Sequence, residues 1–307
     1  MASAMTAFRA AFTGAFLALP WFIPPANAAE KVRVVASFSI IADLVRQVGG
    51  DRVEVTGLVG PNTDMHVFQP APADAKKVLD ANLVVINGLG LEGWADRLVK
   101  ASGYKGPTVV ASKGVKALAA ADDGHGHSHG GKVRNDPHAW QDVANVKVYV
   151  ANIRDGLAAV DAEGKAAYDA AAASYLQSLD SLEAEIRAAY ADVPKAKRRV
   201  ITSHDAFAYY GKAYGIDFVA PQGVGGDTEP TAKDVANLIR QIKSEKVKAV
   251  FVENISNPRL IERIAKETGA SVGGTLYSDA LSETGGPAAS YADMMRHNTK
   301  LLSDAMK

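Results

Sequence analysis

The sequence predicts an α/β protein of two parallel-sheet lobes joined by a long helix, and three observations predict this fold class. First, β-branched runs alternate with helical segments in the first and last thirds of the chain, as is typical of parallel sheets. Second, an alanine-rich helical stretch from Asp142 to about Val193 separates these two parts. Third, the length of 307 residues is about twice the ~150-residue domain prior, which favours two lobes.

The chain begins with the pattern of an export signal. Residues 1–28 carry one charge, at Arg9, and an apolar stretch from Ala10 to Ile23 leads to Ala26-Asn27-Ala28, the small-x-small pattern that signal peptidase cuts after. A membrane anchor is the alternative, but it needs about 20 apolar residues, and Pro20 interrupts this shorter stretch while Pro24 and Pro25 end it. We therefore expect a cleaved signal peptide at residues 1–28.

Composition limits the classes of partner. Without residues 1–28, 279 residues remain, with 33 basic and 34 acidic side chains and a formal charge of −1. Such a balance attracts neither nucleic acid nor an anionic membrane surface. The chain has no cysteine, so we expect no lipid attachment at the mature N-terminus and no disulfides. The expectation is a free periplasmic monomer with no stable membrane anchor and no nucleic-acid partner.

The first lobe, expected at residues 29–141, alternates strands and helices. Apolar residues spaced like the inner face of a helix run from Ile41 to Val48, and Gly49-Gly50 closes that helix. Further helices are expected from Pro72 and over Trp94–Ala101. The expected strands are Val32–Ser37, Val53–Val59, Leu83–Ile86 and Thr108–Ala111.

Residues 142–193 form the expected helical connection, with one break at Asp161–Gly164. The second piece, Lys165–Tyr190, carries an apolar stripe with charges elsewhere. At ~1.5 Å per residue it spans roughly 39 Å, long enough to run along both lobes. A helix in this role permits only small relative motion of the lobes.

The second lobe, expected at residues 194–307, resumes the alternation, although no sequence repeat links the halves. The expected strands are Arg199–Thr202, Asp217–Ala220, Ala249–Glu253 and Ser271–Leu276, and the expected helices are Ala206–Tyr214, Thr231–Ser244, Pro258–Thr268 and Tyr291–Met306.

Four side chains in separate segments are candidate metal ligands: His66, His138, His204 and Asp279. Each falls after an expected strand or before an expected helix, and ligands of open parallel sheets bind beyond the carboxyl ends of strands. Two come from each half, which places the site in the cleft between the lobes. Zinc held by three imidazoles and one carboxylate keeps no open position for a reacting water. The pattern therefore indicates capture of a metal and not an enzyme.

A histidine-rich tract at residues 122–131 offers a second, weaker candidate. It contains His125, His127 and His129 between glycines, a composition that cannot pack a core and often binds metal. The alternative is a linker with incidental histidines. Because the tract ends shortly before Asp136, we expect it near the mouth of the site as an auxiliary metal-binding loop.

Two enzyme-like motifs have simpler interpretations. Gly88-Leu89-Gly90-Leu91-Glu92-Gly93 matches the dinucleotide fingerprint, but the strand that follows ends without the acid that would hold the ribose. We interpret these glycines as turn residues, with Glu92 either supporting the site or on the surface. Ser203-His204-Asp205 are adjacent in sequence and cannot form a catalytic triad. His297, on the last helix, has no partner motif.

Several runs together resemble the metal-specific solute-binding proteins of ABC transporters, the zinc and manganese uptake family. They are Ala36-Ser37-Phe38-Ser39-Ile40-Ile41, Gln69-Pro70-Ala71-Pro72-Ala73-Asp74, Asn87-Gly88-Leu89-Gly90-Leu91-Glu92, Asp136-Pro137-His138-Ala139-Trp140 and Glu229-Pro230-Thr231. The resemblance covers essentially the whole mature chain. It implies two α/β lobes joined by one long helix, with a single divalent ion in the cleft and limited hinge motion.

Within that family the third ligand is histidine in zinc binders and commonly glutamate in manganese binders, and here it is His204. Three imidazoles with one carboxylate suit zinc, whereas manganese prefers more oxygen. The chain departs from the family at Met65, where many members have proline, and at Gln69, where many have glutamate. Gln69 cannot supply a charged partner, so support for His66 must come from elsewhere.

The expected function is capture of Zn2+ in the periplasm and its delivery to an inner-membrane ABC permease. A periplasmic zinc metallochaperone is a further expected partner, one that hands zinc to the histidine-rich loop. The main alternative is a manganese or broad divalent-metal binding protein of the same transporter class. Less favoured alternatives are a zinc hydrolase with Asp279 as general base and an adhesin that uses the metal for stability.

Overall fold

The computed structural model describes residues 1, 30–120, 134–224, 231–245 and 247–307. Residues 31–307 form one compact unit. Apart from Met1, the expected signal peptide lies outside the described residues, as does the histidine-rich tract with His125, His127 and His129. In the described part of the chain, no helix combines the length and the apolar character that crossing a membrane requires.

The first sheet has the strand order β2-β1-β3-β4, and all its strands are parallel. Its strands are β1 Val32–Phe38, β2 Val53–Val59, β3 Leu83–Ile86 and β4 Thr108–Val110, and its helices are α1 Ser39–Gly49, α2 Pro72–Leu79 and α3 Ala95–Ser102, with a short 3-10 turn η1 at Gly50–Arg52. The central strand β1 is buried at all but one position, which is why its sequence is a nearly continuous apolar run.

The second sheet repeats this plan with the order β6-β5-β7-β8, again all parallel. Its strands are β5 Arg199–Ile201, β6 Asp217–Val219, β7 Ala249–Glu253 and β8 Ser271–Leu276, and its helices are α6 Ala208–Tyr214, α7 Ala232–Glu245, α8 Arg259–Thr268 and α9 Tyr291–Met306. In both sheets the first strand lies between the second and the third. The two lobes therefore share one topology without a sequence repeat.

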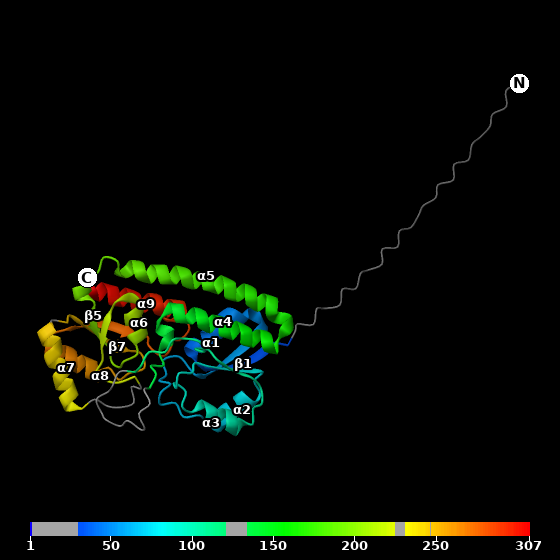
Figure 1. Ribbon diagram of the computed structural model, residues 1–307, viewed down its shortest axis with the longest axis horizontal. Coiled ribbons are helices and arrows are strands. Elements are labelled where there is room, and N and C mark those ends of the chain that lie inside the picture. Colours follow the sequence, from blue (N-terminus) through cyan, green and yellow to red (C-terminus); the bar gives the residue numbers. More distant parts are fainter. Residues whose placement is uncertain (2–29, 121–133, 225–230, 246) are drawn as a thin grey trace. The chain divides into compact units, whose positions relative to one another are not determined.

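A pair of helices connects the sheets. They are α4 Val143–Val160 and α5 Lys165–Tyr190, with 3-10 turns η2 Ala139–Gln141, η3 Ala162–Gly164 and η4 Lys195–Lys197 around them. The 26-residue α5 packs against α1 and α4, next to the first sheet, and against α6 and α9, next to the second. Figure 1 shows α5 running along these helices. Its buried face includes Tyr168, Leu179 and Ile186. This is the long connecting helix that the sequence predicts.

The predicted elements agree with the observed ones to within one or two residues at most ends. For example, β1 continues to Phe38, and α6 begins at Ala208 instead of Ala206. A polar cap explains some boundaries: the Asp142 side chain accepts a hydrogen bond from the Ala144 N–H at the start of α4 (2.9 Å). Local signals of this kind are legible in the sequence before any tertiary contact is known.

Candidate metal centre

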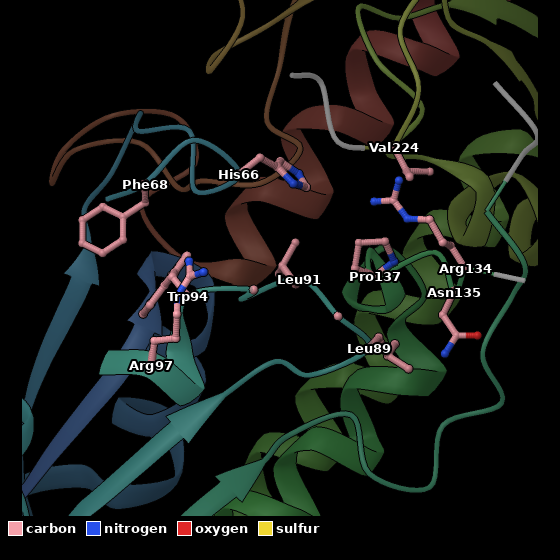
Figure 2. A pocket seen from close by; sticks show the side chains of 12 residues that line it. His66, Phe68, Leu89, Leu91, Trp94, Arg97, Arg134, Asn135, Pro137 and Val224 are labelled. Carbon is pink, nitrogen blue, oxygen red and sulfur yellow. The ribbon is translucent and has the colours of Figure 1, made fainter. Parts of the chain in front are cut away.

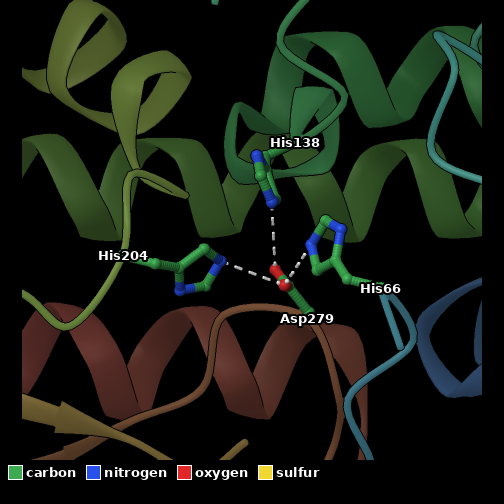
Figure 3. Close-up of side chains that lie close together, drawn as sticks. All are labelled: His66, His138, His204 and Asp279. Carbon is green, nitrogen blue, oxygen red and sulfur yellow. Dashed lines mark hydrogen bonds and ion pairs between the residues drawn. The ribbon is translucent and has the colours of Figure 1, made fainter. Parts of the chain in front are cut away.

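The four candidate ligands come from four different connections and meet between the two sheets. His66 follows β2, His138 directly precedes η2, His204 follows β5, and Asp279 follows β8. One ligand atom from each lies within 4.8 Å of the others, and no second group of this kind occurs in the described ranges. Figure 3 shows the three imidazoles arranged around the carboxylate. The fold thus brings together all four side chains that the sequence singles out.

Asp279 is the centre of this arrangement. Its Oδ2 atom lies 3.0 Å from His66 Nε2 and 3.2 Å from His204 Nε2. Its Oδ1 atom lies 3.5 Å from His138 Nε2. The three imidazole rings are 5.4 to 5.9 Å apart between centroids. All three Nε2 atoms therefore point to one spot, as ligands of a single ion must.

Burial separates one ligand from the other three. His138 and Asp279 have no exposed surface, and His204 is 1% exposed. The His66 side chain keeps 9% of its surface accessible. Among the described residues of the centre, His66 is therefore the most accessible to solvent.

Electrostatics couple the buried groups strongly. Burial alone would lower the pKa of His138, but the charge of Asp279 and the hydrogen bond to Asp136 raise it to about 9. Burial likewise opposes protonation of His204, and the charges of Glu253 and Asp279 raise its pKa well above 6.5. For Asp279, burial favours the neutral acid, but His138 and His204 hold its pKa well below 3.8. Near neutral pH the Asp279 carboxylate is thus charged, and protons on His138 and His204 balance it.

Two carboxylates behind the centre orient two of the imidazoles. Asp136 Oδ1 lies 2.8 Å from His138 Nδ1, and Glu253 Oε2 lies 2.7 Å from His204 Nδ1. A carboxylate at Nδ1 keeps a proton there and leaves Nε2 free to bind a metal, a common arrangement around metal-bound histidine. Each carboxylate therefore fixes which nitrogen of its histidine faces the centre.

Glu253 is anchored more firmly than its counterpart. Its Oε1 atom accepts hydrogen bonds from the backbone N–H groups of Ser203 (2.8 Å) and His204 (2.9 Å), and the residue is 1% exposed. Glu253 is not among the site residues predicted from the sequence. The available signal was an acid at the carboxyl end of a buried strand, the edge where ligands of parallel sheets gather.

Support for His66 comes from its own loop. The Asp64 Oδ1 atom accepts a hydrogen bond from the His66 backbone N–H (2.8 Å), and burial raises the pKa of Asp64. Two residues before Asp64, Asn62 ties this loop to the other lobe, because its N–H donates to the Leu281 carbonyl (2.9 Å). The position of His66 thus depends on contacts between the lobes.

Two side chains of the first lobe hold the segment that carries Asp279. Trp140 Nε1 and Gln141 Nε2 both donate to the Ser278 carbonyl, at 2.9 and 2.8 Å. The Trp140 ring also packs edge-on against His138, with centroids 5.2 Å apart. The ligand sets of the two lobes are therefore joined by direct hydrogen bonds as well as by the centre itself.

The glycine-rich loop is closed by its own acid. Glu92 is buried, and its carboxylate accepts the backbone N–H groups of Asn87 (2.6 Å) and Gly88 (3.0 Å). Gly88 and Gly90 adopt left-handed φ angles of 88° and 87°, so they are turn residues. Since Glu92 takes these donors, they are not free for a phosphate. His297 forms no hydrogen bond with the four candidate ligands. Its Nε2 atom lies 3.0 Å from the Thr275 carbonyl oxygen.

Comparisons with known proteins agree with this geometry. A family model described as zinc-uptake complex component A, periplasmic, matches residues 34–305. The manganese-binding lipoprotein MntA of Halalkalibacterium halodurans is 35% identical over 88% of this chain and 86% of its own. The Mn-bound periplasmic metal-binding protein from Candidatus Liberibacter asiaticus has a TM-score of 0.80 at 28% identity, over 90% of this chain and 100% of its own.

A further solved structure, the periplasmic zinc-binding protein TroA from Treponema pallidum, has a TM-score of 0.83 at 26% identity, over 90% of this chain and 99% of its own. The similar proteins thus include some named for manganese and one named for zinc. The expectation of a zinc-specific protein is not confirmed, and the manganese or broad-metal alternative has the better support among the curated relatives.

Proposed function

The chain belongs to the zinc-uptake complex component A family of periplasmic metal-binding proteins of ABC transporters, and we propose that it captures a divalent transition metal, manganese as well as zinc, for delivery to a membrane permease. The observation that carries this proposal is the convergence of three imidazoles and one carboxylate, from both lobes, to within 4.8 Å. The export-signal pattern of the N-terminus supports a site of action in the periplasm.

We assign the ligands as the Nε2 atoms of His66, His138 and His204 and the carboxylate of Asp279. Two of these groups have buried atoms with no hydrogen-bond partner within the described part of the chain, His138 Nε2 and Asp279 Oδ1. Buried polar atoms without partners are costly. A cation at the centre satisfies both, which fits a site built for an ion.

The chemistry of these ligands supports capture over catalysis. Asp279 lies 3.0 to 3.5 Å from all three imidazoles, so it belongs to the ligand set. In a zinc hydrolase the same carboxylate would stand beyond the ion and activate a water in the fourth position. With four protein ligands around the ion, no position is left for a reacting water, so the metal is bound as the transported ion.

Two considerations favour a broad site. The curated relative with 35% identity is named for manganese, and a solved relative is described as Mn-bound. On any fixed set of nitrogen and oxygen ligands, however, zinc binds more tightly than manganese. We therefore expect both ions to bind, with zinc the tighter in a test tube and metal supply deciding the cargo in the cell.

Zinc-specific uptake is the second candidate, and His204 is the residue that favours it. With histidine at this position the centre offers one carboxylate and three imidazoles, whereas manganese prefers more oxygen ligands. The two candidates differ in one measurable property, the occupancy that manganese reaches when zinc is absent.

A titration of metal-free protein with each ion against a chelator of known affinity tests the proposal. We expect one site that binds zinc, that manganese fills when alone, and that zinc reclaims. His204→Ala should lose this site, while the matched variant His297→Ala, on α9 and outside the centre, should keep it. Failure of manganese to bind would leave the zinc-specific candidate, and absence of any tight site would overturn both.

A further inference from the structure

A cavity of about 470 Å³ opens beside His66, the most accessible of the four ligands. Figure 2 shows its lining side chains. They are His66, Phe68, Leu89, Gly90, Leu91, Gly93, Trp94, Arg97, Arg134, Asn135, Pro137 and Val224. Pockets for small molecules measure ~300–1,000 Å³. This cavity is therefore of the size that holds a small organic ligand, far more than a bare ion needs.

The charge of the cavity is opposite to what a free cation requires. Among its described lining residues are two arginines, Arg97 and Arg134, and no carboxylate. Clefts that steer ions carry charge of the opposite sign, which raises the local concentration and the association rate. An arginine-lined mouth repels bare Zn2+ or Mn2+ and attracts an anion.

The cavity also has donors without acceptors. The guanidinium groups of Arg97 and Arg134 form no ion pair or hydrogen bond with another described residue. Trp94 is 6% exposed, and its Nε1 has no hydrogen-bond partner in the described part of the chain. Guanidinium forks match carboxylates in shape and charge. Two such forks are a receptor for carboxylate oxygens, with Phe68 and Leu91 as the apolar wall.

We propose that this cavity binds a small polycarboxylate that brings the metal as an anionic chelate. Arg97 and Arg134 hold its carboxylates while His66 takes the ion first. Bonds from the metal to carboxylate oxygens are then replaced by bonds to the four ligands, with no change in oxidation state, and the chelator leaves. This inference rests on the proposed function, because it concerns how the same centre is loaded.

Stopped-flow loading of metal-free protein tests the inference, with zinc chloride and zinc citrate as the two probes and tryptophan fluorescence as the readout. In the unchanged protein the loading rate should level off at a non-zero value as citrate is raised, because the chelate itself reacts. In the double variant Arg97→Gln, Arg134→Gln, loading from zinc citrate should slow about tenfold and keep falling with citrate, while loading from zinc chloride should become faster.

The two rates should change in opposite directions, whereas a general defect in folding or metal binding would slow loading from both probes. The matched variant Arg259→Gln, an exposed arginine on α8, should change neither rate. Equal slowing of both probes, or no effect of the double variant, would overturn the inference.

A second measurement keeps the inference distinct from the proposed function. Equilibrium dialysis of labelled citrate against metal-free protein should give one binding site, weakened about tenfold in the double variant. Absence of citrate binding in a protein that still takes up zinc from zinc chloride would overturn the chelate site alone. Absence of zinc binding from either probe would instead overturn the proposed function.

Discussion

The two lobes share one strand order but differ in how firmly they are built. In the first, β1 and β2 are seven residues each and pair along almost their whole length. In the second, β5 and β6 are three residues each, and β5 meets β7 through the single pair Ile201 and Val250. The second lobe therefore depends more on side-chain contacts, including those of the metal centre, to stay ordered.

Their cores differ in the same direction. One apolar cluster runs from β1 through α4 and α5 to α9, and it includes α6 and one face of β5 and β7, so this side of the second sheet shares the core of the first lobe. The layer of α7 and α8 over the second sheet forms a separate, smaller cluster around Ile242 and Ile261. We infer that the layer of α7 and α8 is the part able to loosen when the ion leaves.

The largest expected effect follows from Asp279, which comes from the second lobe and touches histidines of both. Asp279→Asn removes the one negative charge among the ligands. Losing one partner of a buried charged set costs about 3–5 kcal/mol, so metal affinity should fall by roughly a thousandfold. Chelator competition measures this, with Asp304→Asn on the exposed face of α9 as the matched control. Retained affinity would show that Asp279 is not a ligand.

The supporting carboxylates test each lobe in turn. Replacing Glu253 or Asp136 with its amide places an NH2 group at Nδ1 of the histidine, which favours the proton on Nε2 and blocks ligation. Each change should weaken metal binding by about 10–100-fold. Glu253→Gln should be the more severe, because Glu253 also accepts hydrogen bonds from the backbone N–H groups of Ser203 and His204.

The same titration distinguishes these amides from ordinary surface changes. Glu262→Gln, an exposed position on α8, should leave affinity unchanged. An identical small loss in all three variants would mean that the carboxylates do not orient the ligands.

The pH dependence of the metal-free protein is a smaller effect with a definite sign. The pKa of His138 is raised from 6.5 to about 9, so the stability from its protonation is fully present below pH ~6.5 and is lost as pH rises through ~9. The melting temperature of the metal-free protein should therefore fall by several degrees over this window, while zinc affinity rises because fewer protons must be displaced. A melting temperature that rises from pH 6.5 to 9 would contradict the account.

The smallest expected effect concerns the difference in packing between the lobes. Amide hydrogens of α7 and α8 should exchange faster than those of α4 and α5, because local opening is easier in layers with a small core. Adding zinc should slow exchange around His204 and β5 more than around β1. Hydrogen exchange with mass spectrometry resolves these segments, and uniform protection across both lobes would remove the asymmetry.

Most of the fold could be predicted from the sequence because its signals are local. The apolar run of β1, the cap at Asp142 and the break at Asp161–Gly164 each fix an element without distant contacts. The convergence of the four candidate ligands was also predictable, since three of them follow expected strands and His138 precedes an expected helical segment. The division into lobes at residues 29–141, 142–193 and 194–307 stays a prediction.

What could not be predicted depends on contacts between distant segments. In the sequence Glu253 is only the last residue of an expected strand. Its contact with His204 Nδ1 depends on how β7 pairs with β5 in the folded chain. The bonds from Trp140 and Gln141 to the Ser278 carbonyl join residues more than 130 positions apart. The choice of metal is harder still, because zinc and manganese accept the same donor atoms and differ in affinity and geometry.

The central claim is that His66, His138, His204 and Asp279 enclose one transported ion. Anomalous diffraction from crystals of the zinc- and manganese-loaded protein tests it most directly. The account predicts each ion at the same spot, about 2.0–2.2 Å from three Nε2 atoms and the Asp279 carboxylate for zinc. An ion bound elsewhere, or one with water in place of Asp279, would contradict it.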